Sequence, residues 1–510
     1  MFRKVLIANR GEIAVRISQT LQQMGVTAVA VYSEPDRGAL HVASADEAYP
    51  LDGSTSAETY LRIDKIIDVA RRHGVDAIHP GFGFLSENED FAQTCQDAGI
   101  TFVGPSPAVI RDMGDKIIAK EKFAAAGVPV VPGATFSAVE EPRTSVRAAI
   151  DTVRIRAAEI GYPILVKAAA GGGGKGMRVV KSETELGDAI DSARREAGAA
   201  FGDPRVFIEK YISRPRHIEF QIFGDAHGNV VHLFERECSI QRRHQKIVEE
   251  SPSTALSADL RARMGEAAVR AAKAIGYTNA GTVEFILDES GAFYFLEVNT
   301  RLQVEHPVTE MVVGHDLVRA QLLVAAGDRM PFEQDQLRQS GHAIECRIYA
   351  ENPGANFVPS TGRIQQYAAP ASPGIRVDSG VRAGSDVTVH YDPMLAKLIA
   401  WAQSREAAID RMAWALRRFV LLGVTTNIEF LHDVVTHPAH RAGDLHTHFL
   451  DEHAELLTRN PSTPPPPAAF AAAALAARIA SGGRPATASP GAPLESMSCP
   501  WNTHGAWRAF

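Results

Sequence analysis

The sequence predicts an α/β protein of several domains, with an α+β middle part. The chain has 510 residues, which is enough for roughly three domains. Its first third alternates short apolar runs with amphipathic segments, the pattern of a parallel sheet covered by helices. Its middle instead contains alternating apolar and polar residues on both sides of a tight turn, which predicts an antiparallel hairpin.

The N-terminal third is expected to contain repeated βαβ units. A helix should follow the first strand, because apolar residues recur there at helical spacing, and another is expected at about 89–98. The turn after the first strand, Asn9 to Glu12, lacks the GxGxxG pattern, which disfavours a dinucleotide-binding site. Strands are expected at residues 4–9, 27–33, 75–81 and 100–106.

A glycine-rich loop lies within residues 161–180, GYPILVKAAAGGGGKGMRVV, between two expected strands. Consecutive glycines let backbone N–H groups approach phosphate oxygens closely, although a flexible hairpin tip is the alternative. Lys167 favours an anionic ligand, because an unpaired ammonium in an otherwise apolar strand would be costly. Lys175 is followed by Gly176, so the loop does not match a Walker P-loop.

Residues 281–299 are expected to form the hairpin, with GTVEFIL and AFYFLEVN as strands around a DESG turn. Glu297 and Asn299 share one face, because alternate residues of a strand do. Glu284 comes from the partner strand. Two carboxylates and an amide oxygen suit Mg²⁺ or Mn²⁺ beside phosphates, and the alternative is a solvated sheet face. Further polar residues follow directly, namely Arg301, Gln303, Glu305 and His306.

Residues 239–250, SIQRRHQKIVEE, concentrate positive charge. A solvated helix or loop is the default expectation for such a run, and a patch that binds small anions is the alternative. Farther along, HAIECRIYAEN is strand-like and a helix is expected around 407–419. Residues 461–498 are rich in proline and alanine, which is typical of a linker with at most one short helix.

The overall composition restricts the classes of partner and compartment. The net charge of −7 gives no reason to expect nucleic acid or an anionic membrane as a partner. The four cysteines are scattered and no apolar run approaches the ~20 residues that span a bilayer. The first strand is expected to begin by Lys4, which leaves no room for a signal peptide. A cytoplasmic location is therefore expected.

Nine ordered motifs resemble the biotin carboxylase family of the ATP-grasp superfamily over about residues 2–450. They are IANRGEIAVRI, HPGFGFLSEN, MGDK, GYPILVKAAAGGGGKGMRVV, RPRHIEFQI, SIQRRHQKIVEE, EVNTRLQVEHPVTE, ECRIYAE and YDPMLAKLI. Phe82 departs from the family, because many relatives have Tyr there. The resemblance implies a Rossmann-like N-terminal domain (1–115), an ATP-grasp domain (116–328) with a lid at about 130–212, a C-terminal domain (335–450), and a linker that begins a further, truncated region (451–510).

The resemblance also implies a nucleotide and metal site. Lys116 and Lys167 match nucleotide lysines, and Gly173 and Gly174 match the loop over the phosphates. Further nucleotide contacts are implied at Glu209, Lys210, Tyr211, Ile212, His217, Gln241, His244, Glu284 and Glu297. The implied metal ligands are Glu284, Glu297 and Asn299.

The family chemistry joins bicarbonate to biotin. Glu305 matches the base that deprotonates bicarbonate, and Arg347 matches the residue that stabilises the biotin enolate. The implied catalytic residues are Lys246, Arg301, Glu305 and Arg347. The implied bicarbonate and biotin pocket consists of Lys246, Arg301, Gln303, Val304 and Arg347.

ATP, Mg²⁺ or Mn²⁺, bicarbonate, and biotin on a separate carrier domain are the implied cofactors and substrates. ECRIYAEN, with Tyr349, resembles the α subunits of propionyl- or methylcrotonyl-CoA carboxylases. A carboxyltransferase β subunit and a homodimer or larger hetero-oligomer are therefore implied. Two alternatives stay open: another ATP-grasp ligase, such as a carbamoyl-phosphate or purine-pathway carboxylating enzyme, and a catalytically silent ATP-binding subunit.

Overall fold

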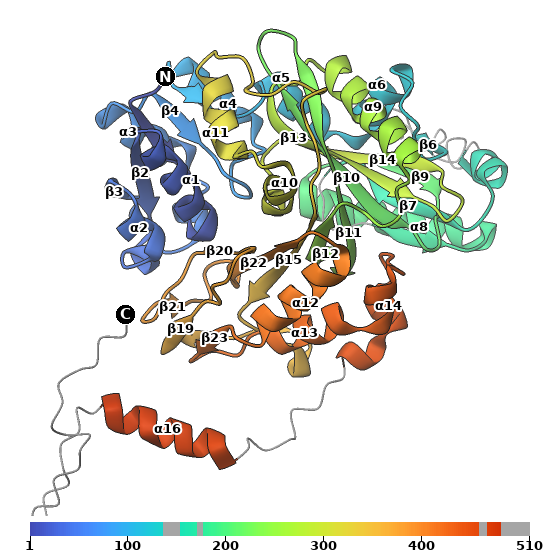
Figure 1. Cartoon of the computed structure of the whole chain (residues 1–510). Helices are drawn as coiled ribbons and strands as arrows, with labels where there is room; N and C mark the ends of the chain where they lie inside the picture. Colours follow the sequence, from blue (N-terminus) through green and yellow to red (C-terminus); the bar gives the residue numbers. More distant parts are fainter. Residues whose placement is uncertain (136–152, 171–176, 458–466, 481–510) are drawn as a thin grey trace, which may run out of the picture. The chain divides into compact units, whose positions relative to one another are not determined.

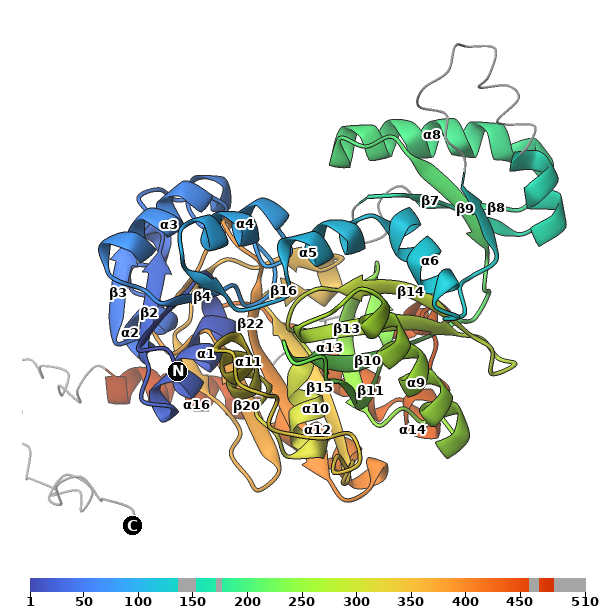
Figure 2. The same cartoon turned by 90° about the horizontal axis from the view of Figure 1, so that it is seen from above.

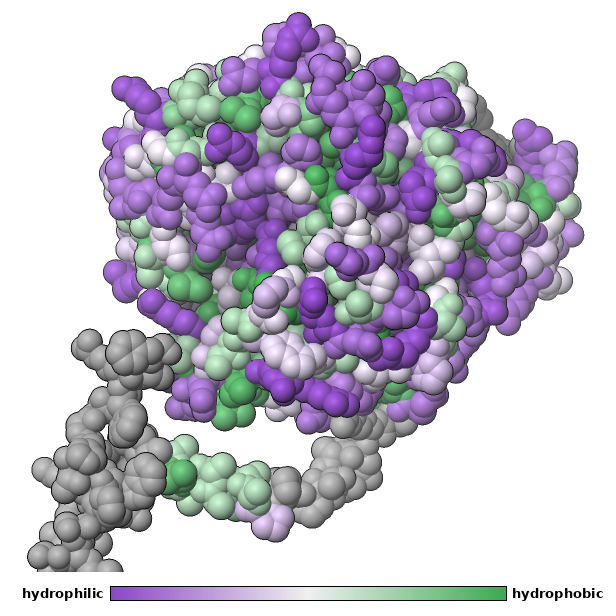
Figure 3. Space-filling model, in the orientation of Figure 1, coloured by the Kyte–Doolittle hydropathy of each residue, from purple (hydrophilic) through white to green (hydrophobic). Residues whose placement is uncertain are grey.

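The computed structural model describes residues 1–135, 153–170, 177–457 and 467–480 (Figure 1). The chain divides into two compact units, Met1–Arg459 and Asn460–Phe510. In the second unit the described part is one helix, α16 (Pro467–Ala480), whose surface is largely apolar (Figure 3). No helix among the described residues is long and apolar enough to cross a membrane.

The first unit begins with a five-stranded parallel sheet in the order β3-β2-β1-β4-β5, as predicted for repeated βαβ units. Side chains of β1 alternate between its two faces: Val5 and Ile7 pack with helix α1 (Gly11–Gln23), and Leu6 packs with α3 (Ile63–Arg72) and α4 (Glu89–Asp97). The strands are β1 (Lys4–Ile7), β2 (Thr27–Tyr32), β3 (Glu47–Pro50), β4 (Ala77–His79) and β5 (Thr101–Phe102). The sequence did not indicate β3.

A separate four-stranded antiparallel sheet lies within residues 133–210, in the order β6-β9-β7-β8. Helix α8 (Glu183–Phe201) covers it and shares a hydrophobic core with it (Figure 2). The strands are β6 (Gly133–Thr135), β7 (Ile164–Ala168), β8 (Arg178–Val180) and β9 (Val206–Lys210). The lid predicted at about 130–212 thus contains its own sheet, whereas the loop with Gly173 and Gly174 lies outside the described residues.

The largest sheet has eight strands in the order β14-β13-β10-β11-β12-β15-β22-β20, each antiparallel to its neighbours. It contains the predicted hairpin and continues into the C-terminal segment, where α12 (Arg405–Leu416) and α13 (Ile428–Thr436) pack on it. The strands are β10 (Arg216–Gly224), β11 (Val230–Arg242), β12 (Gln245–Ser251), β13 (Asn279–Leu287), β14 (Phe293–Asn299), β15 (His342–Tyr349), β20 (Ile375–Ser379) and β22 (Met394–Ala402). The division expected near 328–335 falls before β15 and stays a prediction.

The basic segment 239–250 is a β-hairpin, so the expected solvated helix or loop is wrong. The hairpin buries Ile240, Ile247 and Val248, which the concentration of charge concealed. Its two-residue turn has positive φ angles at Arg243 (+50°) and His244 (+67°). Such turns usually contain Asn or Gly, so the local sequence lacked the usual hairpin signal.

Candidate active site

A cavity of about 800 Å³ is lined by residues from the four-stranded sheet and from the eight-stranded sheet. Its wall includes apolar side chains such as Leu165, Ile286 and Leu296 beside charged groups. This mixture suits a ligand with an aromatic ring and charged oxygens. Eleven residues with implied nucleotide contacts line it: Lys116, Lys167, Glu209, Lys210, Tyr211, Ile212, His217, Gln241, His244, Glu284 and Glu297. Gly173 and Gly174 lie outside the described residues.

Two lysines face Glu209 at the β7–β9 side of this cavity. Lys167 Nζ lies 3.1 Å from one Glu209 oxygen, and Lys120 Nζ lies 2.5 Å from the other. Burial raises the pKa of Glu209, but the two ammonium groups outweigh burial and lower it. Glu209 therefore compensates the buried charge of Lys167, so the position of this lysine in an apolar strand does not by itself require the anionic ligand that the sequence favoured.

The carboxylate hairpin brings the three implied metal ligands together. Glu284 and Glu297 are directly opposite each other in the β13–β14 register, and Asn299 Nδ2 donates to Glu284 Oε1 over 2.7 Å. Burial and the Glu284 charge both raise the pKa of Glu297. Burial would also raise the pKa of Glu284, but Lys246 and His217 lower it. Two carboxylates and an amide oxygen lie together here, a donor set that fits Mg²⁺ or Mn²⁺, while Lys246 and His217 contact the oxygens of Glu284.

Beside this hairpin, Lys246 links the cavity to a buried cluster of charges. Its Nζ lies 2.8 Å from Glu284 Oε1 and 2.8 Å from Glu305 Oε1, and it also contacts Glu219. Arg347 Nη2 lies 2.9 Å from the other oxygen of Glu305. Burial would raise the pKa of Glu305, but these two cations hold it well below its ordinary value. Two cations therefore favour the ionised form of Glu305, although it is only 1% exposed.

Arg301 and Gln303 lie on the hairpin side of this cluster. Arg301 Nη1 donates to Gln303 Oε1 over 2.6 Å, and Arg301 Nε donates to Glu87 Oε2 over 2.9 Å. Gln303 Nε2 in turn donates to Glu284 Oε1 over 3.2 Å. Lys246, Arg301 and Gln303 thus contact the implied metal ligands directly, and Arg347 is connected to them through Glu305 and Lys246.

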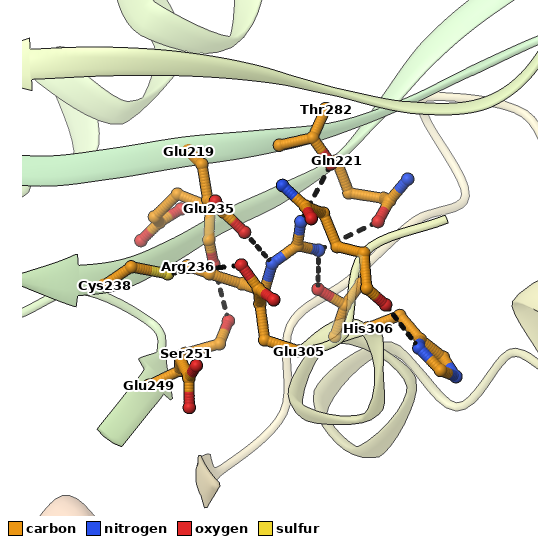
Figure 4. Close-up of polar contacts among 12 residues, drawn as sticks. Glu219, Gln221, Glu235, Arg236, Cys238, Glu249, Ser251, Thr282, Glu305 and His306 are labelled. Carbon is orange, nitrogen blue, oxygen red and sulfur yellow. Dashed lines mark hydrogen bonds and ion pairs between the residues drawn. The ribbon is translucent and has the colours of Figure 1, made fainter. Parts of the chain in front are cut away.

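Four charged residues of this network were not found from the sequence: Glu87, Glu219, Arg236 and Glu249. Arg236 is fully buried and donates to Glu219, Gln221, Thr309 and Thr282, beside the carboxylates of Glu249 and Glu305 (Figure 4). Glu219 could have been found from the sequence. It lies two residues from both His217 and Gln221 on β10, so the three side chains share one face of the strand. Glu249 pairs with Arg347 across strands β12 and β15, which are distant in sequence.

Three family models match consecutive parts of the chain. Residues 1–110 match the biotin carboxylase N-terminal domain, and residues 345–452 match the biotin carboxylase C-terminal domain. Between them, residues 115–333 match the ATP-binding domain of the carbamoyl-phosphate synthase L chain. Along the chain, the first match contains the five-stranded sheet, the second contains the four-stranded sheet and strands β10–β14 of the eight-stranded sheet, and the third contains most of the remaining strands of that sheet.

Known proteins resemble the same region. A biotin carboxylase of Nostoc sp. is 52% identical over 451 residues, which cover 88% of this chain and 99% of that protein. The methylcrotonoyl-CoA carboxylase α subunit of Dictyostelium discoideum is 52% identical, with 89% of this chain and 64% of that protein covered, so the chain spans less than two thirds of such relatives.

Solved structures agree with these matches. The biotin carboxylase domain of Hydrogenobacter thermophilus 2-oxoglutarate carboxylase, solved with MgADP and bicarbonate, has a TM-score of 0.85 and 48% identity. The alignment covers 90% of this chain and 99% of that domain. Together with the cavity, the carboxylate hairpin and the buried cluster around Glu305, these likenesses show that the chain belongs to the biotin carboxylase family.

Proposed function

We propose that this chain is an ATP-dependent biotin carboxylase, which activates bicarbonate as carboxyphosphate and carboxylates biotin on a carrier domain. The observation that carries the proposal is the position of Lys246, whose Nζ lies 2.8 Å from both Glu284, in the cavity wall, and Glu305, in the buried cluster. The phosphates of ATP in the cavity and a bicarbonate ion beside Glu305 would therefore both lie near the ammonium group of Lys246. Positioned charges of this kind stabilise phosphoryl transfer.

The cavity residues are assigned to ATP. Lys116 and Lys167 would neutralise phosphate oxygens, and the segment Glu209–Ile212 would follow the edge of the adenine ring. Glu284, Glu297 and Asn299 would hold Mg²⁺ or Mn²⁺, which neutralises phosphate charge when bound. Arg301 and Gln303, which are hydrogen-bonded to each other and to the hairpin, would orient bicarbonate toward the γ-phosphorus.

Glu305 is assigned as the base. A bicarbonate oxygen bonds to the γ-phosphorus of ATP as the bond to the ADP oxygen breaks, and the bicarbonate proton moves to a carboxylate oxygen of Glu305. In the structure Lys246 and Arg347 hold both oxygens of Glu305 and lower its pKa. An arriving anion would draw those donors toward itself, so the pKa of Glu305 would rise when the base is needed.

Arg347 is assigned to the second half-reaction. Carboxyphosphate breaks down to CO₂ and phosphate, the released phosphate takes the proton of the ureido nitrogen of biotin, and that nitrogen then bonds to the carbon of CO₂. The negative charge on the ureido oxygen needs a fixed donor, and Arg347 is held by Glu249 Oε1, 2.6 Å from its Nε. A guanidinium fixed in this way is preorganised for an oxyanion.

The direct test measures ATP hydrolysis with and without bicarbonate and free biotin, and the transfer of labelled bicarbonate to biotin. The proposal expects hydrolysis to require bicarbonate and label to appear on biotin. Hydrolysis that responds to bicarbonate without labelling biotin would favour another ATP-grasp ligase. Nucleotide binding without any hydrolysis would favour a silent subunit.

The chain is further proposed to be the biotin carboxylase part of an acyl-CoA carboxylase of the methylcrotonoyl- or propionyl-CoA type, acting in the cytoplasm as a homodimer or in a larger hetero-oligomer. Tyr349 and the identity to methylcrotonoyl-CoA carboxylase α subunits support this assignment. Co-purification with a carboxyltransferase β subunit, followed by an assay of both acyl-CoA esters, tests it. Failure to bind such a subunit would count against it.

A further inference from the structure

We infer that Lys397 is a positioning residue for the bicarbonate pocket, because it fixes the backbone of the segment that carries Gln303, Val304 and Glu305. The inference rests on the proposed function of that segment. Lys397 lies on β22, far from the pocket in sequence, and belongs to the YDPMLAKLI motif, to which no role has been assigned above.

The side chain of Lys397 is fully buried beside the segment that carries the pocket residues. Its Nζ donates to the backbone oxygen of Val304 over 2.8 Å and lies 3.3 Å from Glu12 Oε1. It also lies 5.7 Å from the centre of the Phe82 ring, within the range of a cation–π contact. Glu12 and Phe82 come from two other unassigned motifs, IANRGEIAVRI and HPGFGFLSEN. Residues from three separate motifs therefore lie together around the ammonium group of Lys397.

The bond to Val304 orients Glu305 because the peptide unit between them is planar. Fixing the Val304 carbonyl fixes that plane, and with it the direction in which the chain enters Glu305. The neighbouring carbonyls are held as well: Gln303 O lies 2.7 Å from His306 Nδ1, and Glu305 O accepts from Val308 N over 3.2 Å. The donors to the Gln303 and Glu305 oxygens come from the same segment of the chain. Among the described contacts of these three carbonyls, only the Val304 oxygen accepts from a distant element.

Glu12 supplies charge compensation. An ammonium without solvent needs an acidic partner, and Glu12 is itself only 4% exposed. Asp378 Oδ2 lies 3.9 Å from the same Nζ. The start of α1, which carries Glu12, lies directly against Gly380, where an added Cβ would come within 2.6 Å of Glu12 N. Glu12 therefore stabilises the buried charge, and the bond to Val304 acts on the pocket.

Because the two contacts of Lys397 have different roles, their effects on activity and on stability can be measured separately. Removing Lys397 alone would leave Glu12 as a buried carboxylate and would also free the Val304 carbonyl. Removing both charges together would relieve the first problem and not the second. A residue with a merely structural role would regain activity in the double variant, whereas a positioning residue would not.

The experiment compares Lys397→Met, Glu12→Gln and Glu12→Gln/Lys397→Met with the wild-type chain. It measures the thermal midpoint, the Kd of ATP, and kcat/KM for bicarbonate in ATP hydrolysis without biotin. Lys65→Met is the matched control, because Lys65 Nζ also holds backbone carbonyls, such as Leu51 O at 2.8 Å, but in the N-terminal sheet region.

We expect Lys397→Met and the double variant to lose about 10²-fold in kcat/KM for bicarbonate, the scale on which small misplacements act. The Kd of ATP should stay within about threefold of wild type. The double variant should regain the thermal midpoint lost in Lys397→Met without regaining activity. Glu12→Gln and Lys65→Met should keep near wild-type kcat/KM, since both leave the bond from Lys397 to Val304 in place.

Three results would overturn the inference while the proposed function stands. The first is a wild-type kcat/KM in Lys397→Met, and the second is recovery of activity in the double variant. The third is an equal loss in Glu12→Gln, which would show that the ion pair matters rather than the carbonyl bond. A wild-type chain whose ATP hydrolysis ignores bicarbonate would instead overturn the proposed function, and this inference with it.

Discussion

Replacing Glu305 by glutamine tests the proposed base while leaving its shape almost unchanged. The carboxylate lies between Lys246 at 2.8 Å and Arg347 at 2.9 Å, and it is 1% exposed. Glu305→Gln removes the negative charge and the capacity to accept the bicarbonate proton. A positioned general base contributes about 10²–10⁴-fold to rate, which corresponds to about 3–5 kcal/mol of the barrier.

The cost in stability should be much smaller, because each cation keeps another acidic partner. Lys246 still contacts Glu219 and Glu284, and Arg347 still contacts Glu249. Losing charged hydrogen bonds under these conditions costs about 2 kcal/mol. For a unit of 459 residues that unfolds as one block, this corresponds to a fall of about 2 °C in the thermal midpoint.

The assay is phosphate release with and without free biotin, alongside fixation of labelled bicarbonate. Both activities should fall together by about 10²–10⁴-fold, since carboxyphosphate precedes both. Glu289→Gln is the matched control, because its side chain is 70% exposed and its ion pair with Arg214 spans 3.8 Å. A Glu305→Gln chain that keeps its fold and more than about a tenth of wild-type phosphate release would refute the assignment of Glu305 as the base.

Three further predictions follow from the same contacts. Arg236→Met should lower the free energy of unfolding by about 3–5 kcal/mol, whereas Arg62→Met, which removes an exposed ion pair, should leave the free energy of unfolding close to that of the wild type; equal losses in urea denaturation would contradict this. Burial would raise the pKa of Glu250, but His342 and other cations lower it from 4.5 to about 2, so its contribution is present above pH 4.5 and lost as the pH falls toward 2. Glu250→Gln should therefore flatten the fall of unfolding free energy in that window, and an unchanged slope would count against the ion pairs. Glu297→Gln should raise the Mg²⁺ concentration for half-maximal ATP hydrolysis by more than about tenfold, and an unchanged Mg²⁺ titration would show that the hairpin holds no metal.

The sequence predicted features that depend on local periodicity or on the family's motifs. The strand–helix alternation of the first third, the 281–299 hairpin and the Glu297–Asn299 face all follow from periods of 3.6 and 2 residues, and the structure confirms these elements. The same rule could have found Glu219. The prediction of a solvated helix or loop at 239–250 was wrong. The turn at Arg243 and His244 has positive φ angles but lacks the glycine or asparagine that usually indicates such a turn in a sequence.

The sequence by itself determined which chemical groups this protein has, because the motifs specify lysines, carboxylates and arginines in a fixed order along the chain. Only the tertiary structure decided how they pair. Arg347 meets Glu305 and Glu249, and Lys397 meets Val304 and Glu12, across separations from about 40 to nearly 400 residues along the chain. Such pairs form where strands, helices and loops distant in sequence pack against one another, and burial then makes each charge depend on its partner. Local patterns contain no information about either step.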